Sequence, residues 1–301
     1  MTAATATPPV AAPTPPSPNA SAGRRKAGWF AKITVLVIVI LWVIPTLGVL
    51  LTSFRNVDDA NSTGWWTLFT NPSQWAHLSF DNYHAAITKA HLGRAFLNTL
   101  AIALPATFIP ILIAAFAAYA FTFMRFPGRG TLFILIVSLL VVPNFVAFVP
   151  LTKLYRTLHI TGFPAAWLAH IGFGMSLAVY VLRNYMATLP REVIESAKID
   201  GATHFQTFWR LILPMSAPAL ASFAIFQFMW VWNDILVALI FVGPGENQPI
   251  TVATNSLIGQ LGTGWDQVTA GGLFSMLVPV AVFLSLQRFF VRGLTAGAVK
   301  G

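Results

Sequence analysis

The sequence predicts an all-α integral membrane protein with six transmembrane helices. Only 9% of the 301 residues are charged and 56% are hydrophobic, whereas soluble domains carry about 25% charged residues. No cysteine is present, which excludes disulfides, thiolate nucleophiles and zinc–thiolate sites. Apolar runs that approach the ~20 residues needed to cross the ~30 Å hydrocarbon core predict the spans. These runs are 29–52, 95–123, 131–151, 164–182, 218–242 and 271–290.

The segment before the first span, residues 1–28, is expected to be a disordered cytosolic tail. Its first part is uncharged and rich in Ala, Pro, Ser and Thr, so it buries too little apolar surface to fold. Arg24, Arg25 and Lys26 then give it a basic end that resembles the start of a signal peptide. However, the apolar run that follows exceeds an h-region of about 7–15 residues, and no small-residue cleavage site closes it. We therefore expect a retained transmembrane helix.

Several spans contain proline, at Pro45, Pro105, Pro110, Pro143 and Pro279. Proline is tolerated in membrane helices when neighbouring groups satisfy the carbonyl that it frees. We therefore expect kinks within continuous spans, with a gate as the alternative role.

The distribution of basic residues predicts that both termini face the cytosol. If the N-terminus is cytosolic and the spans alternate, only Arg55, Lys89, Arg94, Lys153 and Arg156 of the 18 Lys and Arg residues fall on the outer side. Such an excess on one side marks the cytosolic face. The loop 243–270 contains no Lys or Arg, as expected of an outer loop.

One cytosolic stretch, 189–214, does not read as a membrane span but as the start of a helical hairpin. Pro190 suits the first turn of a helix, where its missing N–H has no partner to lose. Glu192 complements the positive end of that helix. Asp200 and Gly201 predict its end, since glycine readily adopts a left-handed conformation.

A second short helix is expected to follow this turn. Thr203 and Gln206 have the spacing of a capping box, and Pro214 with Pro218 is expected to end the helix. A rigid helix–turn–helix on the cytosolic side is compatible with a docking element and with an amphipathic surface hairpin.

A longer pattern within this stretch favours the docking element. Glu195-Ser196-Ala197, then Gly201 after three residues, then Leu211-x-Leu213-Pro214 after nine more, resembles the EAA loop of the permeases of ABC importers. Two positions depart from that pattern, because Ser196 replaces the second alanine and Leu211 replaces an isoleucine. Both changes are small.

The resemblance extends over most of the chain. The segments 118–121 and 125–129 resemble the second-span exit of sugar permeases, and 232–236 resembles their WND motif. The end of the chain, 290–301, is similar to the C-terminus of the maltose-type second permease. The loop 64–83 resembles the α-glucoside branch more weakly. The chain thus resembles the maltose-type second permease family of ABC sugar importers. This resemblance implies the type I ABC importer permease fold.

The resemblance implies that the EAA loop, 189–218, is a coupling helix that docks on a separate ATPase. The residues expected to couple to the ATPase are Glu195, Ala197, Asp200, Gly201, Ala202, Leu213 and Pro214. The C-terminal tail is expected to contact the ATPase through Gly297 and Lys300.

The same resemblance implies the partners of the chain in a bacterial cell membrane. They are two ABC ATPase subunits, a second related permease, an extracytoplasmic sugar-binding protein, the sugar and membrane lipid, with no nucleic acid. The chain itself is not expected to be an enzyme, since it lacks the G-x-x-x-x-G-K-[ST] phosphate loop. ATP and magnesium belong to the partner, and this chain is expected to hold neither a cofactor nor a metal.

The pair Asn233 and Asp234 stands out within the fifth span, because an acid at membrane depth is costly and suggests function. With Trp230 it could line the substrate path, or it could tie one helix to its neighbours, and we favour the structural role. A proton relay is disfavoured because the sequence places no second acid or histidine nearby.

Three other functions remain open at this point. The chain could be an ABC permease for a solute other than a sugar. It could be an ion-coupled secondary transporter, which would require internal repeats and paired acids near the midplane. It could also be a membrane-anchored scaffold that binds a partner through the loop.

Overall fold

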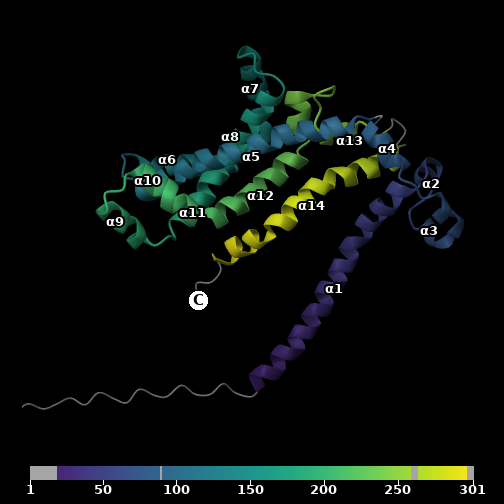
Figure 1. Ribbon diagram of the computed structural model, residues 1–301, viewed down its shortest axis with the longest axis horizontal. Helices are drawn as coiled ribbons and strands as arrows, with labels where there is room; N and C mark the ends of the chain where they lie inside the picture. Colours follow the sequence, from purple (N-terminus) through teal and green to yellow (C-terminus); the bar gives the residue numbers. More distant parts are fainter. Residues whose placement is uncertain (1–18, 89, 259–263, 297–301) are drawn as a thin grey trace, which may run out of the picture. The chain divides into compact units, whose positions relative to one another are not determined.

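The computed structural model describes residues 19–88, 90–258 and 264–296 (Figure 1). Every regular element in these ranges is helical, which confirms the predicted all-α class. The chain divides into two compact units, residues 1–49 and 50–301, and each is described by itself.

The described part of the first unit is most of α1 (Asn19–Phe54). Its stretch Gly28–Thr52 is long and apolar enough to cross a membrane, in agreement with the first predicted span. Pro45 lies inside α1 without ending it. Because α1 begins at Asn19, helix replaces the disorder expected for the end of the tail, while residues 1–18 lie outside the described residues.

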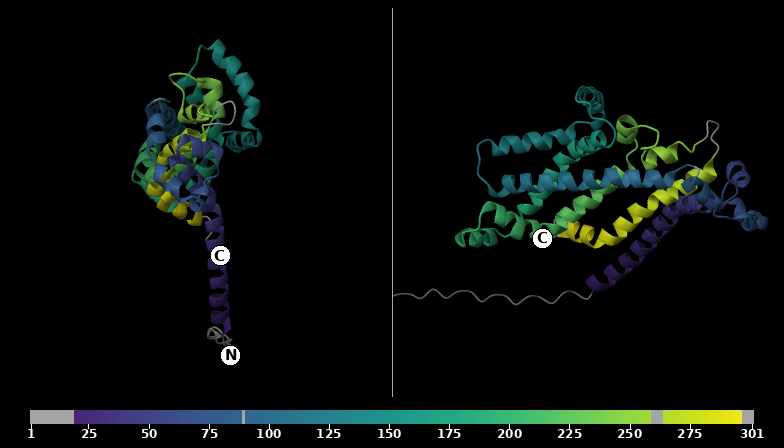
Figure 2. Two further views of the ribbon diagram at one scale, coloured as in Figure 1. Left: turned by 90° about the vertical axis from the view of Figure 1, so that its right-hand side faces the viewer. Right: turned by 45° about the horizontal axis from the view of Figure 1, so that its top comes forward.

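The second unit is built on four long helices that lie side by side in two views (Figures 1 and 2). They are α5 (Leu92–Phe123), α8 (Phe163–Met186), α12 (Ala217–Asn233) and α14 (Trp265–Ala296). Alanines that are at most 1% exposed occur on both α5 and α8, at Ala103, Ala106, Ala114, Ala166, Ala169 and Ala178. Such small residues allow two membrane helices to approach closely.

The prediction that the third span is a single helix is wrong. The span consists of α6 (Arg129–Ser138), the short 3₁₀ helix η2 (Leu139–Val141) and α7 (Asn144–Thr157), and the two helical parts meet at 102°. Pro143 explains the break, since it lacks an N–H and disfavours helical geometry in the residue before it. Val142 is accordingly extended, with φ −76° and ψ 119°.

The prediction that the fifth span, 218–242, is one continuous helix is also wrong. α12 ends at Asn233, and Asp234 is extended with φ −74° and ψ 126°. Its Oδ1 accepts a hydrogen bond from the N–H of Val237 at 2.7 Å, which starts the separate π-helical turn η4 (Ala238–Val242).

The span count depends on how bent helices are treated. Among the described residues, four helices are long and apolar enough to cross a membrane by themselves. The predicted six result only if each of two bent pairs counts as one span. These pairs are 129–141 with 144–157, and 204–215 with 217–233.

The loop between α1 and α5 is a folded cap at one end of the second unit (Figure 1). It contains α2 (Val57–Ser62), α3 (Thr67–Thr70), the 3₁₀ helix η1 (Pro72–His77) and α4 (Asp81–Thr88). Arg55 is 1% exposed and donates to the Thr63 carbonyl at 2.9 Å. Burial lowers the pKa of Arg55, while the nearby Asp59 carboxylate opposes that shift.

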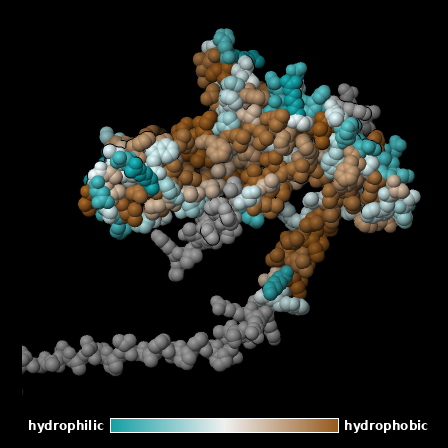
Figure 3. All heavy atoms as spheres, in the orientation of Figure 1, coloured by the Kyte–Doolittle hydropathy of each residue, from teal (hydrophilic) through white to brown (hydrophobic). Residues whose placement is uncertain are grey.

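The remaining segments give the second unit two distinct ends. α13 (Ile250–Asn255) lies in the loop before α14. Three short helices lie at the end opposite α2 to α4 (Figures 1 and 2), namely α9 (Arg191–Ile199), α10 (His204–Thr207) and α11 (Leu213–Met215). Hydrophobic residues cover the middle of the visible face of this unit, and hydrophilic residues gather toward its ends (Figure 3). This pattern is the one expected of a membrane-embedded helical body.

Candidate functional site

The stretch after α8 forms the expected helix–turn–helix. α9 (Arg191–Ile199) begins after Pro190, which is the N-cap rather than a first-turn residue, and Glu192 lies in its first turn. Gly201 has φ +78°, in the left-handed region that favours glycine. The N–H of Gly201 donates to the Lys198 carbonyl at 3.1 Å, and that of Ala202 donates to the Ala197 carbonyl at 2.9 Å. The predicted glycine stop is confirmed.

The predicted capping box is confirmed as well. The N–H of Gln206 donates to Thr203 Oγ1 at 3.2 Å, and the N–H of Thr203 donates to Gln206 Oε1 at 2.9 Å. These bonds start α10 (His204–Thr207).

The second helix ends at Met215, between Pro214 and Pro218, as predicted. α10 continues through a π-helical turn, η3 (Phe208–Ile212), into α11 (Leu213–Met215), and the chain bends by 71° before α12. The hydrogen bonds of a π turn join residues that are five positions apart, so the turn is wider than that of an α-helix. The wider turn before Pro214 accommodates a residue that lacks an N–H donor.

One face of this helix–turn–helix is fixed to the body of the second unit. Ile194, Phe208 and Ile212 are at most 4% exposed and belong to the same core as Leu182 and Met186 of α8. Burial of side chains of this size stabilises each contact by about 1.5–3 kcal/mol. The α9–α11 segment is therefore a rigid extension of the long helices.

A polar contact that the sequence does not reveal adds to this anchor. The Tyr119 hydroxyl of α5 and His204 Nδ1 of α10 are 2.9 Å apart. Phe208 also stacks on Phe116 of α5 with ring centroids 4.4 Å apart. Because 85 residues separate Tyr119 from His204, no local pattern could have indicated their contact.

The predicted coupling residues divide into three groups. Ala197, Asp200, Gly201 and Ala202 line one cavity of about 370 Å³ at the turn. Glu195 lies in a different hollow, described below. Leu213 and Pro214 belong to α11, at the end of the segment that leads into α12. Leu213 packs against the buried core, and Pro214 is exposed.

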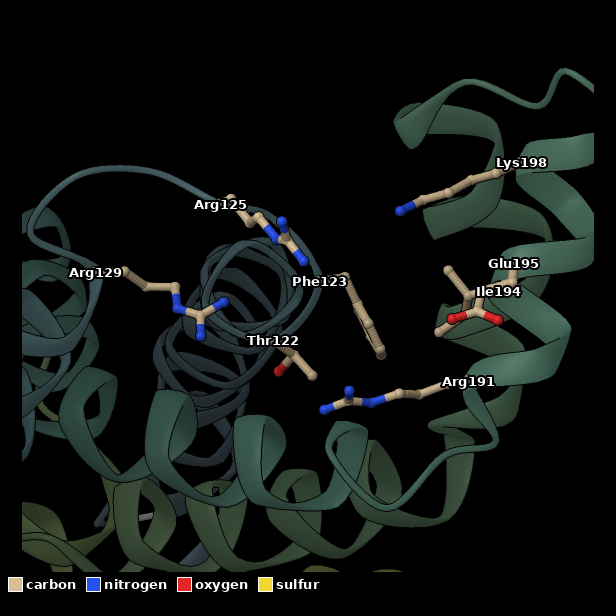
Figure 4. A pocket seen from close by; sticks show the side chains of 8 residues that line it. All are labelled: Thr122, Phe123, Arg125, Arg129, Arg191, Ile194, Glu195 and Lys198. Atoms are coloured by element: carbon tan, nitrogen blue, oxygen red, sulfur yellow. The ribbon is translucent and has the colours of Figure 1, made fainter.

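The hollow that contains Glu195 lies between α9 and the end of α5, with a volume of about 260 Å³ (Figure 4). Four basic side chains share it with this carboxylate. They are Arg125, Arg129, Arg191 and Lys198. Sequence analysis assigned these residues only to the cytosolic side, not to a common site.

The polar pair at the end of α12 makes structural contacts. Asn233 Nδ2 donates to the Met229 carbonyl at 2.8 Å. Asp234 caps the η4 turn through Val237, and its carbonyl accepts from Thr251 Oγ1 at 3.0 Å. Trp230 faces a separate hollow of about 270 Å³ that also contains Pro143 and its neighbours. The three residues therefore do not form one site.

A buried polar group between α5, α8 and α12 escaped sequence analysis. Gln227 is fully buried, and its Nε2 donates to the carbonyls of Ala106 at 3.2 Å and His170 at 3.3 Å. His170 also lines a cavity of about 10 Å³ together with Asp234. The expectation that no histidine lies near Asp234 is wrong.

The remaining predicted contact residues, Gly297 and Lys300, lie outside the described residues. In the described part of the chain, no group of three or more His, Asp and Glu side chains could hold a metal ion.

Fold and site together define a multi-pass helical membrane protein with a helix–turn–helix packed at one end of its long helices. Comparison with known proteins narrows this class. Residues 110–296 match the family described as "Binding-protein-dependent transport system inner membrane component". The chain belongs to this family, and it is the transmembrane permease component rather than the ATPase.

Curated relatives match over nearly their full length. The osmoprotective compounds uptake permease protein GgtD of Synechocystis is 49% identical, with 89% of this chain and 91% of that protein covered. The alpha-glucoside transport system permease protein AglG of Rhizobium meliloti is 37% identical, with 91% and 97% covered. These matches favour the ABC permease over the ion-coupled and scaffold alternatives.

A solved structure has the same fold. The bacterial ABC transporter involved in the import of alginate aligns with a TM-score of 0.72 at 17% identity, covering 92% of this chain and all of that one. The overall helical fold of this chain is therefore shared with a solved ABC transporter.

Proposed function

We propose that this chain is the permease subunit of an ATP-driven carbohydrate importer and that the α9–α11 segment couples it to a separate ATPase. The coupling role is inferred from the different surroundings of the two faces of this segment. One face is buried against α5 and α8, and the other presents the Gly201 turn in an open cavity. A displacement of the turn is therefore transmitted to the long helices rather than absorbed by a loop.

The small residues at the turn suit close contact with a partner. Ala197, Gly201 and Ala202 leave a cavity of about 370 Å³ that a side chain of the ATPase can enter. Asp200 adds an exposed carboxylate beside it. ATP and magnesium bind to the ATPase in this proposal, and this chain supplies the mechanical connection.

The proposed substrate class follows from the relatives. AglG is by name an alpha-glucoside permease, and AraQ of Halalkalibacterium halodurans, 30% identical, is by name an arabinooligosaccharide permease. Together with the sequence similarity to sugar permeases, these names support a carbohydrate substrate, with α-glucosides as the first class to test. A permease for a non-sugar solute is the alternative.

The proposed assembly contains two ATPase subunits, a second permease and an extracytoplasmic binding protein, with both termini of this chain in the cytosol. A second solved neighbour, with a TM-score of 0.58, is an alginate ABC transporter in complex with an alginate pentasaccharide-bound periplasmic protein. The opposite placement of α2–α4 and α9–α11 supports this topology, because it offers one end to a binding protein and the other to the ATPase (Figure 1).

The test is transport by the complex that purifies through a tag on this chain. The complex is reconstituted in liposomes with its binding protein, and ATP-dependent uptake of maltose, sucrose, melibiose and glutamine is compared. Uptake of an α-glucoside that requires both ATP and the binding protein supports the proposal. Uptake of glutamine alone would replace the carbohydrate assignment with the non-sugar alternative.

A further inference from the structure

The hollow between α9 and the end of α5 concentrates positive charge. Arg191, Glu195 and Lys198 follow one another at intervals of four and three residues, which places them on one face of α9. Figure 4 shows Arg191 and Lys198 extending from α9 toward the end of α5, with Arg125 on the opposite side of the hollow. Four cations thus face one carboxylate.

None of these four cations forms an ion pair with another described residue. In the ranges that the structure describes, the ion pairs join other residues, His77 with Asp59 and Arg94 with Glu246. Arg129 donates to the Met124 carbonyl at 3.0 Å, a contact that fixes the side chain without cancelling its charge. Like charges held around one space attract an anion from outside the chain.

The position of the hollow favours a lipid as the source of that anion. The apolar helix α5 ends at Phe123, and the turn with Arg125 follows immediately, so this turn lies where a membrane span ends. α6 begins at Arg129 and exposes Leu132 and Leu135, at 47% and 58%. A headgroup in the hollow can therefore continue into acyl chains along α6. Basic pockets at the cytosolic ends of membrane helices are suited to anionic headgroups.

We propose that this hollow binds the phosphate group of an anionic phospholipid from the cytosolic leaflet. Arg125 and Arg129 contact it from the α5–α6 turn, and Arg191 and Lys198 contact it from α9. The lipid bridges the coupling segment to the membrane-embedded helices. This inference uses only the cytosolic placement of α9 from the proposed function, and its test requires neither ATPase nor sugar.

The experiment is native mass spectrometry of the purified full-length chain with equal amounts of phosphatidylglycerol and phosphatidylcholine. Wild type is expected to retain phosphatidylglycerol selectively. A basic residue near an anionic headgroup contributes roughly a factor of five, so Arg125→Gln with Arg191→Gln should weaken retention about 25-fold. Two variants serve as controls, Arg125→Lys with Arg191→Lys, which keeps the charge, and Lys32→Gln with Arg210→Gln, which removes equal charge elsewhere. Both should bind like wild type.

Three results would overturn the proposal. Equal loss of phosphatidylglycerol retention in the Lys32/Arg210 control would show that the effect depends only on the net charge of the chain. Displacement of the lipid by excess inorganic phosphate, with phosphate adducts in its place, would make the source a soluble anion. Unchanged lipid retention in the Arg125/Arg191 variant would show that these basic side chains do not hold the lipid.

Discussion

At the scale of single residues, the sharpest constraint on the coupling turn is the backbone of Gly201. Its φ of +78° costs a non-glycine residue roughly 1–2 kcal/mol, except that asparagine tolerates this region better. Gly201→Val should therefore reduce ATP-dependent uptake strongly, while Gly201→Asn retains most of it. Uptake by the reconstituted complex checks this prediction. Equal uptake by both variants would show that the turn geometry is not needed for coupling.

A second residue-scale prediction concerns two glycines of α8. A Cβ on Gly174 would lie 2.6 Å from Gln227 Oε1, whereas a Cβ on Gly172 meets nothing within 4 Å. Overpacking costs about 1–3 kcal/mol, so Gly174→Ala should lower the unfolding temperature in detergent and Gly172→Ala should not. Equal unfolding temperatures of the two variants would contradict the close packing of α8 against α12 at Gly174.

Asp234 permits a test of its structural role. Its Oδ1 caps the turn at Val237, and asparagine can accept the same hydrogen bond. We expect Asp234→Asn to keep both stability and uptake, and Asp234→Ala to lose about 1 kcal/mol of stability. Thermal unfolding and uptake are measured for both. Loss of uptake in a stable Asp234→Asn protein would instead indicate that the carboxylate acts on the substrate or on a proton.

At the scale of elements, α9 is fixed mainly by Ile194, which is 4% exposed, whereas its neighbour Val193 is 37% exposed. Ile194→Ala should cost about 2–5 kcal/mol and increase hydrogen exchange along α9. Val193→Ala is the matched control and should change little. Equal exchange in the two variants would mean that α9 is not anchored through its buried face.

The elements also show which parts of the fold are local enough to be predicted. The Gly201 stop and the Thr203–Gln206 capping box depend on residues a few positions apart, and both were predicted correctly. The breaks at Pro143 and Asp234 were not, because an apolar run looks the same whether a helix continues or restarts within it. Proline signalled only a kink, whereas the two helical parts meet at 102°.

At the scale of the whole molecule, the family could be predicted from the sequence because its motifs are spaced along the chain, and the match over residues 110–296 confirms it. The arrangement of the candidate site could not be predicted. The contact of Tyr119 with His204, the Gln227 group and the basic hollow all join residues far apart in sequence. Their partners are determined by helix packing and carry no local pattern.

The central claim is that the Gly201 turn contacts the ATPase, and site-specific cross-linking tests it most directly. The chain contains no cysteine, so Ala202→Cys can be labelled with a photoreactive maleimide, with Ser62→Cys at the opposite end as the control. The account predicts a cross-link to a co-purified ABC ATPase from position 202 and none from position 62. Cross-linking of the ATPase from position 62, or from neither position in an intact complex, would contradict it.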